Sequence, residues 1–191
     1  MELNHPLERT IKTITYNGIA YDIVERKEVL WVGCLDYARN NRDESDGDAT
    51  LSRFQQLLGV EKRELVNPAW SAALWLNYDT DEKPCGLMFA QETYSDKQDS
   101  RYELITQPAG LWLRIRRSRK TSLTMFGSES IDAWDYLSCG EMRKAAEANG
   151  YTINPDVHMQ IGYDCHEEYS TPPHTCYAYL AVVNSEEHSC T

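Results

Sequence analysis

Two stretches of sequence decide the fold: residues 21–32, YDIVERKEVLWV, and residues 102–113, YELITQPAGLWL. At a constant offset of 81 residues, Tyr21 aligns with Tyr102 and Trp31 aligns with Trp112. A second match follows in the same order, since LWLNYD at residues 74–79 aligns with MQIGYD at residues 159–164 at an offset of 85. Two matches in the same order and at nearly the same spacing indicate a duplicated chain.

Each copy contains one helical pattern between segments that alternate like strands. In the first copy, apolar residues at 51, 54, 57 and 58 follow the candidate caps Thr50 and Ser52. In the second copy, the helical pattern runs from residue 131 to Gly150, with a possible break at residues 138–140. The other segments alternate with period two, so each half reads βαββ.

The expected fold is therefore α+β. Duplicated βαββ units, related by a pseudo-two-fold axis, form one or more antiparallel sheets with helices on one side and a ligand cleft between the halves. Residues 1–20 are expected to be an N-terminal extension and residues 184–191 a C-terminal tail. The single domain spans residues 21–183, and its halves are residues 21–94 and residues 102–183.

Composition excludes several classes of protein. The chain has 191 residues, of which 41% are hydrophobic, which suits one compact domain. Its net charge of −11 argues against direct binding to nucleic acid or to an anionic membrane, and favours cationic partners. Neither an apolar run of membrane-spanning length nor the pattern of a signal peptide is found, so we expect a cytoplasmic protein.

Motifs for cofactors and metals are weak. Cys165, His166, His174 and Cys176 are of the right types to bind a metal, but their spacing matches no standard zinc pattern. We expect no metal and no cofactor. The basic run at residues 114–120 is interpreted as the solvated end of a strand, although a protein partner or an acidic ligand could use it. A homodimer also remains open.

The alternation of the strands predicts which residues face the helices and which face the cleft. Met159, Ile161 and Tyr163 should lie under the helices, on the same side as Ala178, Leu180 and Val182. The opposite face should hold an aromatic pocket with one acid. The residues expected to bind ligand are Trp31, Trp75, Asn77, Met88, Glu92, Trp112, His158, Gln160, Tyr177 and Tyr179.

Such a lining suits a flat cation, because ring faces attract cations and a cation makes a buried carboxylate tolerable. Glu92 is expected to be the principal acid of the pocket. The alternative for any single aromatic residue is an ordinary place in the core of the sheet. Only their clustering on one predicted face favours a binding site.

The segments YDIVERKEVLWVGC, ALWLNYD and CYAYLAVV resemble the GyrI-like family of small-molecule-binding domains. This is also the effector-binding domain of AraC-type and MerR-type multidrug regulators. The resemblance covers residues 20–183 and implies a cleft open to cationic, amphipathic and aromatic drugs. The family places glutamates where Gln160 and Tyr177 stand here, while Tyr179 keeps the family's tyrosine. That departure puts a cationic preference and any hydrolytic activity in doubt.

The first functional hypothesis is a stand-alone protein that binds a small aromatic, cationic compound without changing it, for drug sensing or sequestration. The second is a hydrolase of a reactive small molecule, which would need a base within reach of the attacked atom. The third is a protein-interaction module that regulates transcription or gyrase.

Overall fold

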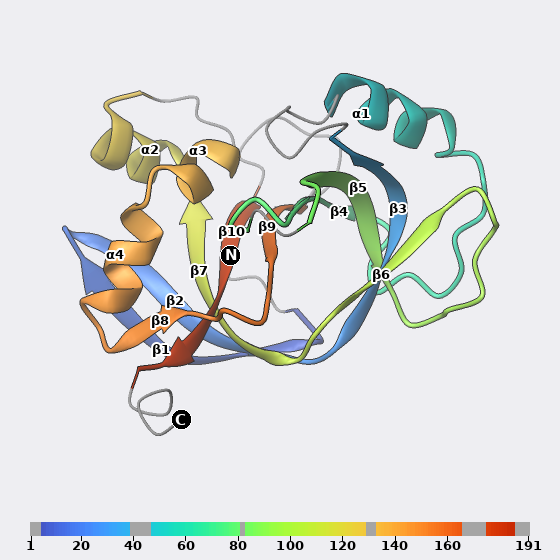
Figure 1. Ribbon diagram of the computed structural model, residues 1–191. Helices are drawn as coiled ribbons and strands as arrows, with labels where there is room; N and C mark the ends of the chain where they lie inside the picture. The colour runs from blue at the N-terminus through green and yellow to red at the C-terminus, as the bar shows by residue number, and fades with distance from the viewer. Residues whose placement is uncertain (1–4, 39–46, 81–82, 129–132, 166–174, 186–191) are drawn as a thin grey trace.

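The computed structural model describes residues 5–38, 47–80, 83–128, 133–165 and 175–185. Its centre is one 10-stranded antiparallel sheet (Figure 1). The strands are β1 (Glu8–Tyr16), β2 (Ile19–Arg26), β3 (Val29–Tyr37), β4 (Trp70–Leu76), β5 (Gly86–Thr93), β6 (Glu103–Gln107), β7 (Gly110–Arg117), β8 (Tyr151–Ile153), β9 (Met159–Cys165) and β10 (Thr175–Asn184). The helices are α1 (Gly47–Gln56), α2 (Arg119–Phe126), α3 (Ala133–Ser138) and α4 (Glu141–Glu147).

The strand order shows the duplication directly. It runs β1-β2-β7-β10-β9-β4-β5-β3-β6, with β8 paired to β10 outside this path. Exchanging β2 with β6, β3 with β7, β4 with β9 and β5 with β10 reproduces the same order read backwards, apart from β1. The pseudo-two-fold axis therefore passes between β4 and β9, where Leu74 lies opposite Ile161. The predicted α+β fold with pseudo-two-fold symmetry is confirmed.

The first half has one strand more than the predicted βαββ unit, and the second half has two more, because it also contains the short strand β8. The two matching sequence stretches each form two strands, β2 with β3 and β6 with β7, separated by short turns at residues 27–28 and 108–109. These strands exchange partners between the halves, since β2 pairs with β7 and β3 pairs with β6. The halves are thus interlocked through the sheet and do not merely lie side by side.

The helices depart from prediction in two places. Helix α1 begins at Gly47, earlier than the predicted caps at Thr50 and Ser52. The helix predicted from residue 131 is present as α3 and α4, with the break at the predicted position, where Gly140 adopts a φ of 79°. Helix α2 was not predicted: it starts inside the basic run, behind Ser118, whose side chain accepts a hydrogen bond from the Thr121 N–H.

The sheet curls upon itself. Arg26 of β2 contacts Glu92 of β5, although four strands lie between β2 and β5 in the sheet order. We call the face enclosed by this curl the inner face, and the opposite face, which carries the helices, the outer face. Helices α2–α4 cover the outer face of one half and α1 covers that of the other (Figure 1).

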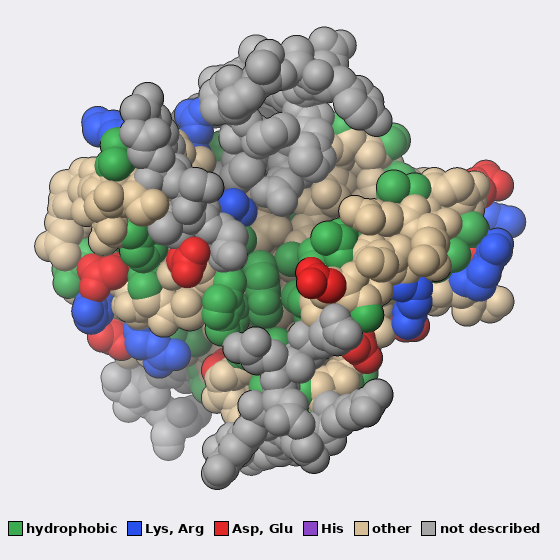
Figure 2. Space-filling view, turned by 90° about the horizontal axis from the view of Figure 1, so that it is seen from above, with side chains coloured by type: hydrophobic (Ala, Val, Ile, Leu, Met, Phe, Trp, Pro, Cys, Tyr) green, Lys and Arg blue, Asp and Glu red, His purple; other side chains and the backbone are tan. Residues whose placement is uncertain are grey.

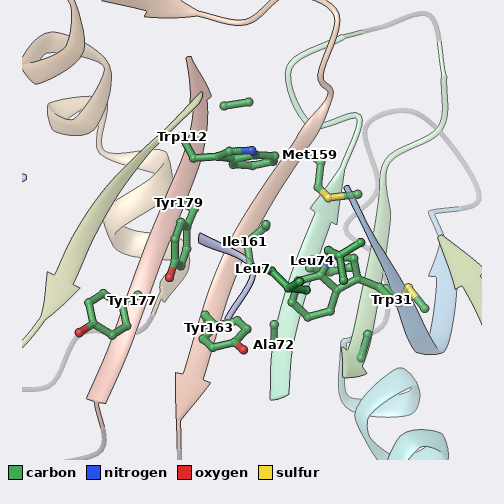
Figure 3. Packing of buried hydrophobic residues seen from close by; sticks show 14 of the residues in the cluster. Leu7, Trp31, Ala72, Leu74, Trp112, Met159, Ile161, Tyr163, Tyr177 and Tyr179 are labelled. Atoms are coloured by element: carbon green, nitrogen blue, oxygen red, sulfur yellow. The ribbon is translucent and has the colours of Figure 1, made fainter. Parts of the chain in front are cut away.

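The inner face holds an apolar cluster to which none of the four described helices contributes (Figure 3). The expectation that Met159, Ile161 and Tyr163 lie under the helices is wrong, because all three belong to this inner cluster. Strand β9 is set by its pairing with β10, which places Ile161 opposite Tyr179. Directly opposite residues share a face. The predicted outward direction of Leu180 and Val182 is confirmed, since both pack against the helices.

Residues of the expected N-terminal extension join the sheet. Strand β1 pairs antiparallel with β2 and forms one edge of the sheet. Leu7, just before β1, packs in the inner cluster beside Ile161 and Leu74 (Figure 3). In the described part of the chain, no helix has the length and apolar character needed to cross a membrane.

Gly33 of β3 provides a test of the sheet geometry. A Cβ at this position would lie 2.0 Å from the Phe89 carbonyl oxygen and 2.7 Å from the Ala90 Cα, so β3 and β5 would have to separate. We expect Gly33→Ala to lower the free energy of unfolding by about 1–3 kcal/mol or more, measured by urea denaturation. Gly59→Ala is the control, because its Cβ would meet nothing within 4 Å. Equal stability of the two variants would contradict the close approach of β3 and β5.

Candidate functional site

Six charged or titratable side chains gather on the inner face, and we call them the inner polar cluster: His5, Glu8, Asp22, Arg26, Glu92 and Arg114. They come from the segment before β1 and from β1, β2, β5 and β7. His5 and Glu92 are each 3% exposed and Arg26 is 1% exposed. Buried charges of this kind require partners, so the geometry of the cluster decides what it can bind.

Glu92 accepts three hydrogen bonds at the centre of the cluster. Its Oε1 accepts from Nη2 of Arg26. Its Oε2 lies 2.6 Å from Nε2 of His5 and 3.0 Å from the Tyr163 hydroxyl, which donates to it. The carboxylate is therefore held on one side by a guanidinium and on the other by a ring nitrogen and a phenol.

The tautomer of His5 follows from its neighbours. The Leu7 N–H donates to Nδ1 of His5 at 3.1 Å, so Nδ1 carries no proton. The remaining ring proton lies on Nε2 and points at Glu92, which makes His5 a neutral aromatic N–H donor here. The imidazole also stacks on Trp70, with ring centroids 5.1 Å apart and planes inclined by 24°.

Glu8 links the two arginines of the cluster. Its carboxylate accepts from Nη1 of Arg114, and its Oε2 lies 3.7 Å from Nε of Arg26. Arg114 also donates to Oδ2 of Asp22 at 2.7 Å. The Arg26 guanidinium lies 4.8 Å from the Tyr179 ring centroid, and that of Arg114 lies 4.9 Å from the Tyr177 ring centroid. Both cations are thus placed against aromatic rings as well as carboxylates.

The pKa values reflect this pairing. Burial by itself would raise the pKa of Glu92, but the charge of Arg26 and the hydrogen bond from His5 outweigh it, so the pKa of Glu92 lies below its ordinary value. Burial would lower the pKa of Arg26, yet the nearby Glu92 carboxylate outweighs that effect and raises it. Both groups are therefore charged at neutral pH.

The expectation of one acid in the pocket is wrong, because the carboxylates of Glu8 and Asp22 lie in the same cluster. Glu92 is also already neutralised by Arg26. Sequence reasoning missed Arg26 as well as His5, which lies 87 residues away from Glu92 along the chain. The sequence did contain one pattern that places Arg26 on the inner face. Asp22, Val24 and Arg26 alternate with the helix-facing Tyr21 and Ile23, which places Arg26 on the inner face of its strand.

The structure separates the residues expected to line one pocket into two groups. Trp31, Trp112, Tyr177 and Tyr179 are buried on the inner face (Figure 3). Met88 belongs to the same cluster, and the buried Glu92 lies opposite Trp31 on this face. The other residues, which lie on the outer face or at the strand ends beside it, are Trp75, Asn77, His158 and Gln160. The prediction of a single cleft lined by both groups is wrong, whereas the binding role of each residue stays a prediction.

The register of β4 explains the separation. Trp75 lies opposite Leu87 and Gln160, while Leu74 lies opposite Met88. Trp75 and Met88 therefore point to opposite faces of the sheet. On the outer face the Trp75 ring packs 5.6 Å from that of Trp134 of α3.

Gln160 contributes to a cavity of about 310 Å³ on the outer face. Tyr78, Trp134, Arg143 and Asp79 also line this cavity. Figure 2 shows hydrophobic side chains gathered between the part of the molecule that carries α2–α4 and the part that carries α1. A small apolar molecule could lie here, but the cavity lacks the buried ion pair of the inner face.

A second cavity, of about 400 Å³, opens beside the inner polar cluster. It is lined by Leu7 and Glu8 of the N-terminal segment, by Arg26, and by Ala109 and Gly110 of the turn before β7. Glu8 and Arg26, which pairs with Glu92, thus both line this space.

The basic run does not form one charged surface. Arg114 points into the inner polar cluster, whereas Arg116 is exposed. The side chains of the candidate metal ligands Cys165, His166, His174 and Cys176 lie outside the described residues. Within the described residues, no group of three or more His, Cys, Asp or Glu side chains could hold a metal ion.

No protein-family model matches this sequence. No curated protein matches it either. The fold, however, matches solved structures. One is a protein from Staphylococcus aureus MU50 described as a bacterial transcription regulation protein, with a TM-score of 0.55 and 10% identity over 86% of this chain and 99% of that one.

The C-terminal domain of EcmrR is a second structural neighbour. It matches with a TM-score of 0.57 and 12% identity, over 86% of this chain and 97% of that domain. At such low identity the likeness concerns the fold alone. The curled, pseudo-symmetric sheet of this chain is therefore consistent with a GyrI-like fold.

Proposed function

We propose that this chain binds a small planar aromatic compound at the Glu92 carboxylate on the inner face. The observation that carries the proposal is the surroundings of Oε2 of Glu92, which meets one ring N–H and one phenol beside the ring of Trp70. A flat ring placed where the His5 ring lies would stack on Trp70 and donate a hydrogen bond to Glu92.

The ion pair with Arg26 refines the kind of compound. Since Arg26 neutralises the carboxylate, the site does not need a fixed positive charge. What Oε2 requires is a hydrogen-bond donor. An aromatic amine or azole, neutral or protonated, would supply one, while a quaternary ammonium compound would not.

Binding without chemical change fits the state of Glu92. A general base works best with a pKa near the working pH. Interaction with Arg26 and His5 lowers the pKa of Glu92, which makes the carboxylate a weak base. A hydrolytic role therefore finds less support on the inner face than a binding role.

The fold supports a proposal for a wider role in sensing or sequestration. The structural neighbours include a bacterial transcription regulation protein and the C-terminal domain of EcmrR. We propose that this chain likewise acts as an effector-binding unit, signalling to a protein partner or a second copy, without direct contact to nucleic acid.

The first test uses 2-aminobenzimidazole as the probe. We expect Glu92→Gln to weaken its binding about tenfold to a hundredfold, because a hydrogen bond to a charged group contributes about 1.5–3 kcal/mol. Calorimetric titration at pH 7 measures the affinity. The matched probe is 1,3-dimethylbenzimidazolium, which has a similar shape but no N–H, and whose binding should change little. Equal losses for the two probes would contradict hydrogen-bond recognition by Glu92.

The second test compares two tryptophans. Trp70→Ala should weaken 2-aminobenzimidazole by about 0.5–1.5 kcal/mol, roughly threefold to tenfold, because it removes the stacking surface. Trp75→Ala is the matched control, since Trp75 lies on the outer face against Trp134. Its affinity should equal that of the original chain. A loss only in Trp75→Ala would instead place the compound in the outer cavity.

A further inference from the structure

The proposed binding site is occupied by the protein's own chain. Residues 5–8, His-Pro-Leu-Glu, run along the inner face, and three of the four make contacts inside it. His5 reaches Glu92, Leu7 packs in the apolar cluster, and Glu8 reaches both Arg26 and Arg114. Figure 3 shows Leu7 between Ile161, Leu74 and Tyr163.

The segment presents two chemical groups at a fixed separation. One is a neutral aromatic ring with its N–H on Glu92, and the other is a carboxylate on the arginines. Because Pro6 and Leu7 join these groups, the segment has the form of a small compound with an aromatic donor at one end and an acid at the other.

Arg26 could bind a better hydrogen-bond acceptor than the Glu8 carboxylate. The side chain is 1% exposed, yet its Nε and Nη1 atoms have no hydrogen-bond partner among the described residues. The nearest carboxylate oxygen of Glu8 lies 3.7 Å from Nε, beyond hydrogen-bond range. Such buried, unused donors are costly, and an acid that approached from the neighbouring cavity of about 400 Å³ would satisfy them.

The net charge of the inner polar cluster also favours a ligand that bears an acidic group. Three carboxylates, on Glu8, Asp22 and Glu92, face two guanidinium groups while His5 is neutral, which leaves one negative charge. Withdrawal of Glu8 would leave the remaining groups neutral. A ligand that carries an acid restores the charge of the observed state, whereas a purely cationic ligand would leave a buried positive charge.

We propose that residues 5–8 are an intramolecular stand-in for the ligand, which is an aromatic N–H donor that also bears an acidic group, and that ligand binding displaces this segment. The inference rests on the proposed function and adds the ligand class and a built-in competitor. Displacement also breaks the hydrogen bond of 2.9 Å from the Lys27 N–H to the Leu7 carbonyl, which ties the segment to the end of β2. Ligand occupancy is thereby converted into release of the N-terminal segment.

The test titrates the peptide acetyl-His-Pro-Leu-Glu-amide into the full chain and into the variant His5→Ala/Glu8→Gln. A segment that competes within its own chain lowers the apparent affinity of a ligand by the fraction of time for which the site is vacant. We expect the variant to bind the peptide at least tenfold more tightly than the original chain. The matched control is His158→Ala/Asp79→Asn, which removes another His–carboxylate pair, of 3.0 Å, outside the inner face and should leave peptide binding unchanged.

Two altered peptides test the ligand class. Replacing His by Ala, or Glu by Gln, should each weaken binding to the His5→Ala/Glu8→Gln variant at least tenfold. Peptide affinity that is equal in the variant and the original chain would overturn the stand-in. Equal affinity of the three peptides would overturn the ligand class. Loss of 2-aminobenzimidazole binding on Glu92→Gln tests the proposed function separately, so it can hold while the stand-in fails.

A second measurement needs no variant. In the original chain, saturation with the peptide should speed hydrogen exchange at the Lys27 amide, whose acceptor is the Leu7 carbonyl. The Ala148 amide at the end of α4, which donates to the Lys144 carbonyl at 2.9 Å, is the internal reference, because α4 packs on the outer face. Unchanged exchange at Lys27 in the saturated protein would contradict displacement.

Discussion

The contact between Arg26 and Glu92 joins strands that are far apart in the sheet, and the inner face depends on it. Burial of two charges is costly unless they are paired and hydrogen-bonded, and the loss of one partner typically costs about 3–5 kcal/mol. Arg26 lies at the end of β2 and Glu92 near the end of β5, so the pair holds the curl of the sheet closed. His5, Tyr163 and Glu8 contact this pair directly, and Glu8 connects it to Arg114.

The duplication gives the two halves of the sheet equivalent strands, and the candidate site lies where the residues of the two halves differ. Trp31 and Trp112 occupy equivalent positions on the inner faces of β3 and β7. Their cross-strand neighbours differ, since Trp31 lies opposite Glu92 and Trp112 opposite Ala181. The acid therefore stands in one half only. In the second half, Arg114 of β7 is paired instead with Glu8 and Asp22, which come from the two N-terminal strands.

The repeat in the sequence predicted the fold because equivalent strands must occupy equivalent places. Strand faces were harder to predict where both faces are buried. In β9, Ile161 packs on the inner face, while Gly162 packs against Trp75 and Ala133 on the outer face. Neither face is a polar, solvent-exposed one, so the alternation of residue types does not tell which face is which. The partners of Glu92 could not be predicted from the sequence for another reason. His5 and Arg26 are brought to it by the curl of the sheet, which no local pattern of the sequence contains.

The chemistry of the inner face explains why residues 5–8 of the same chain lie there. Without His5, Oε2 of Glu92 would keep only the Tyr163 hydroxyl, and the rings of Trp70 and Tyr163 would lose the imidazole that packs against them. Leu7 covers apolar surface that water would otherwise meet. A buried carboxylate beside aromatic rings thus demands an occupant that is flat, donates a hydrogen bond and excludes water. Any molecule that binds here must have the same three properties, because the residues of the sheet that surround it require them.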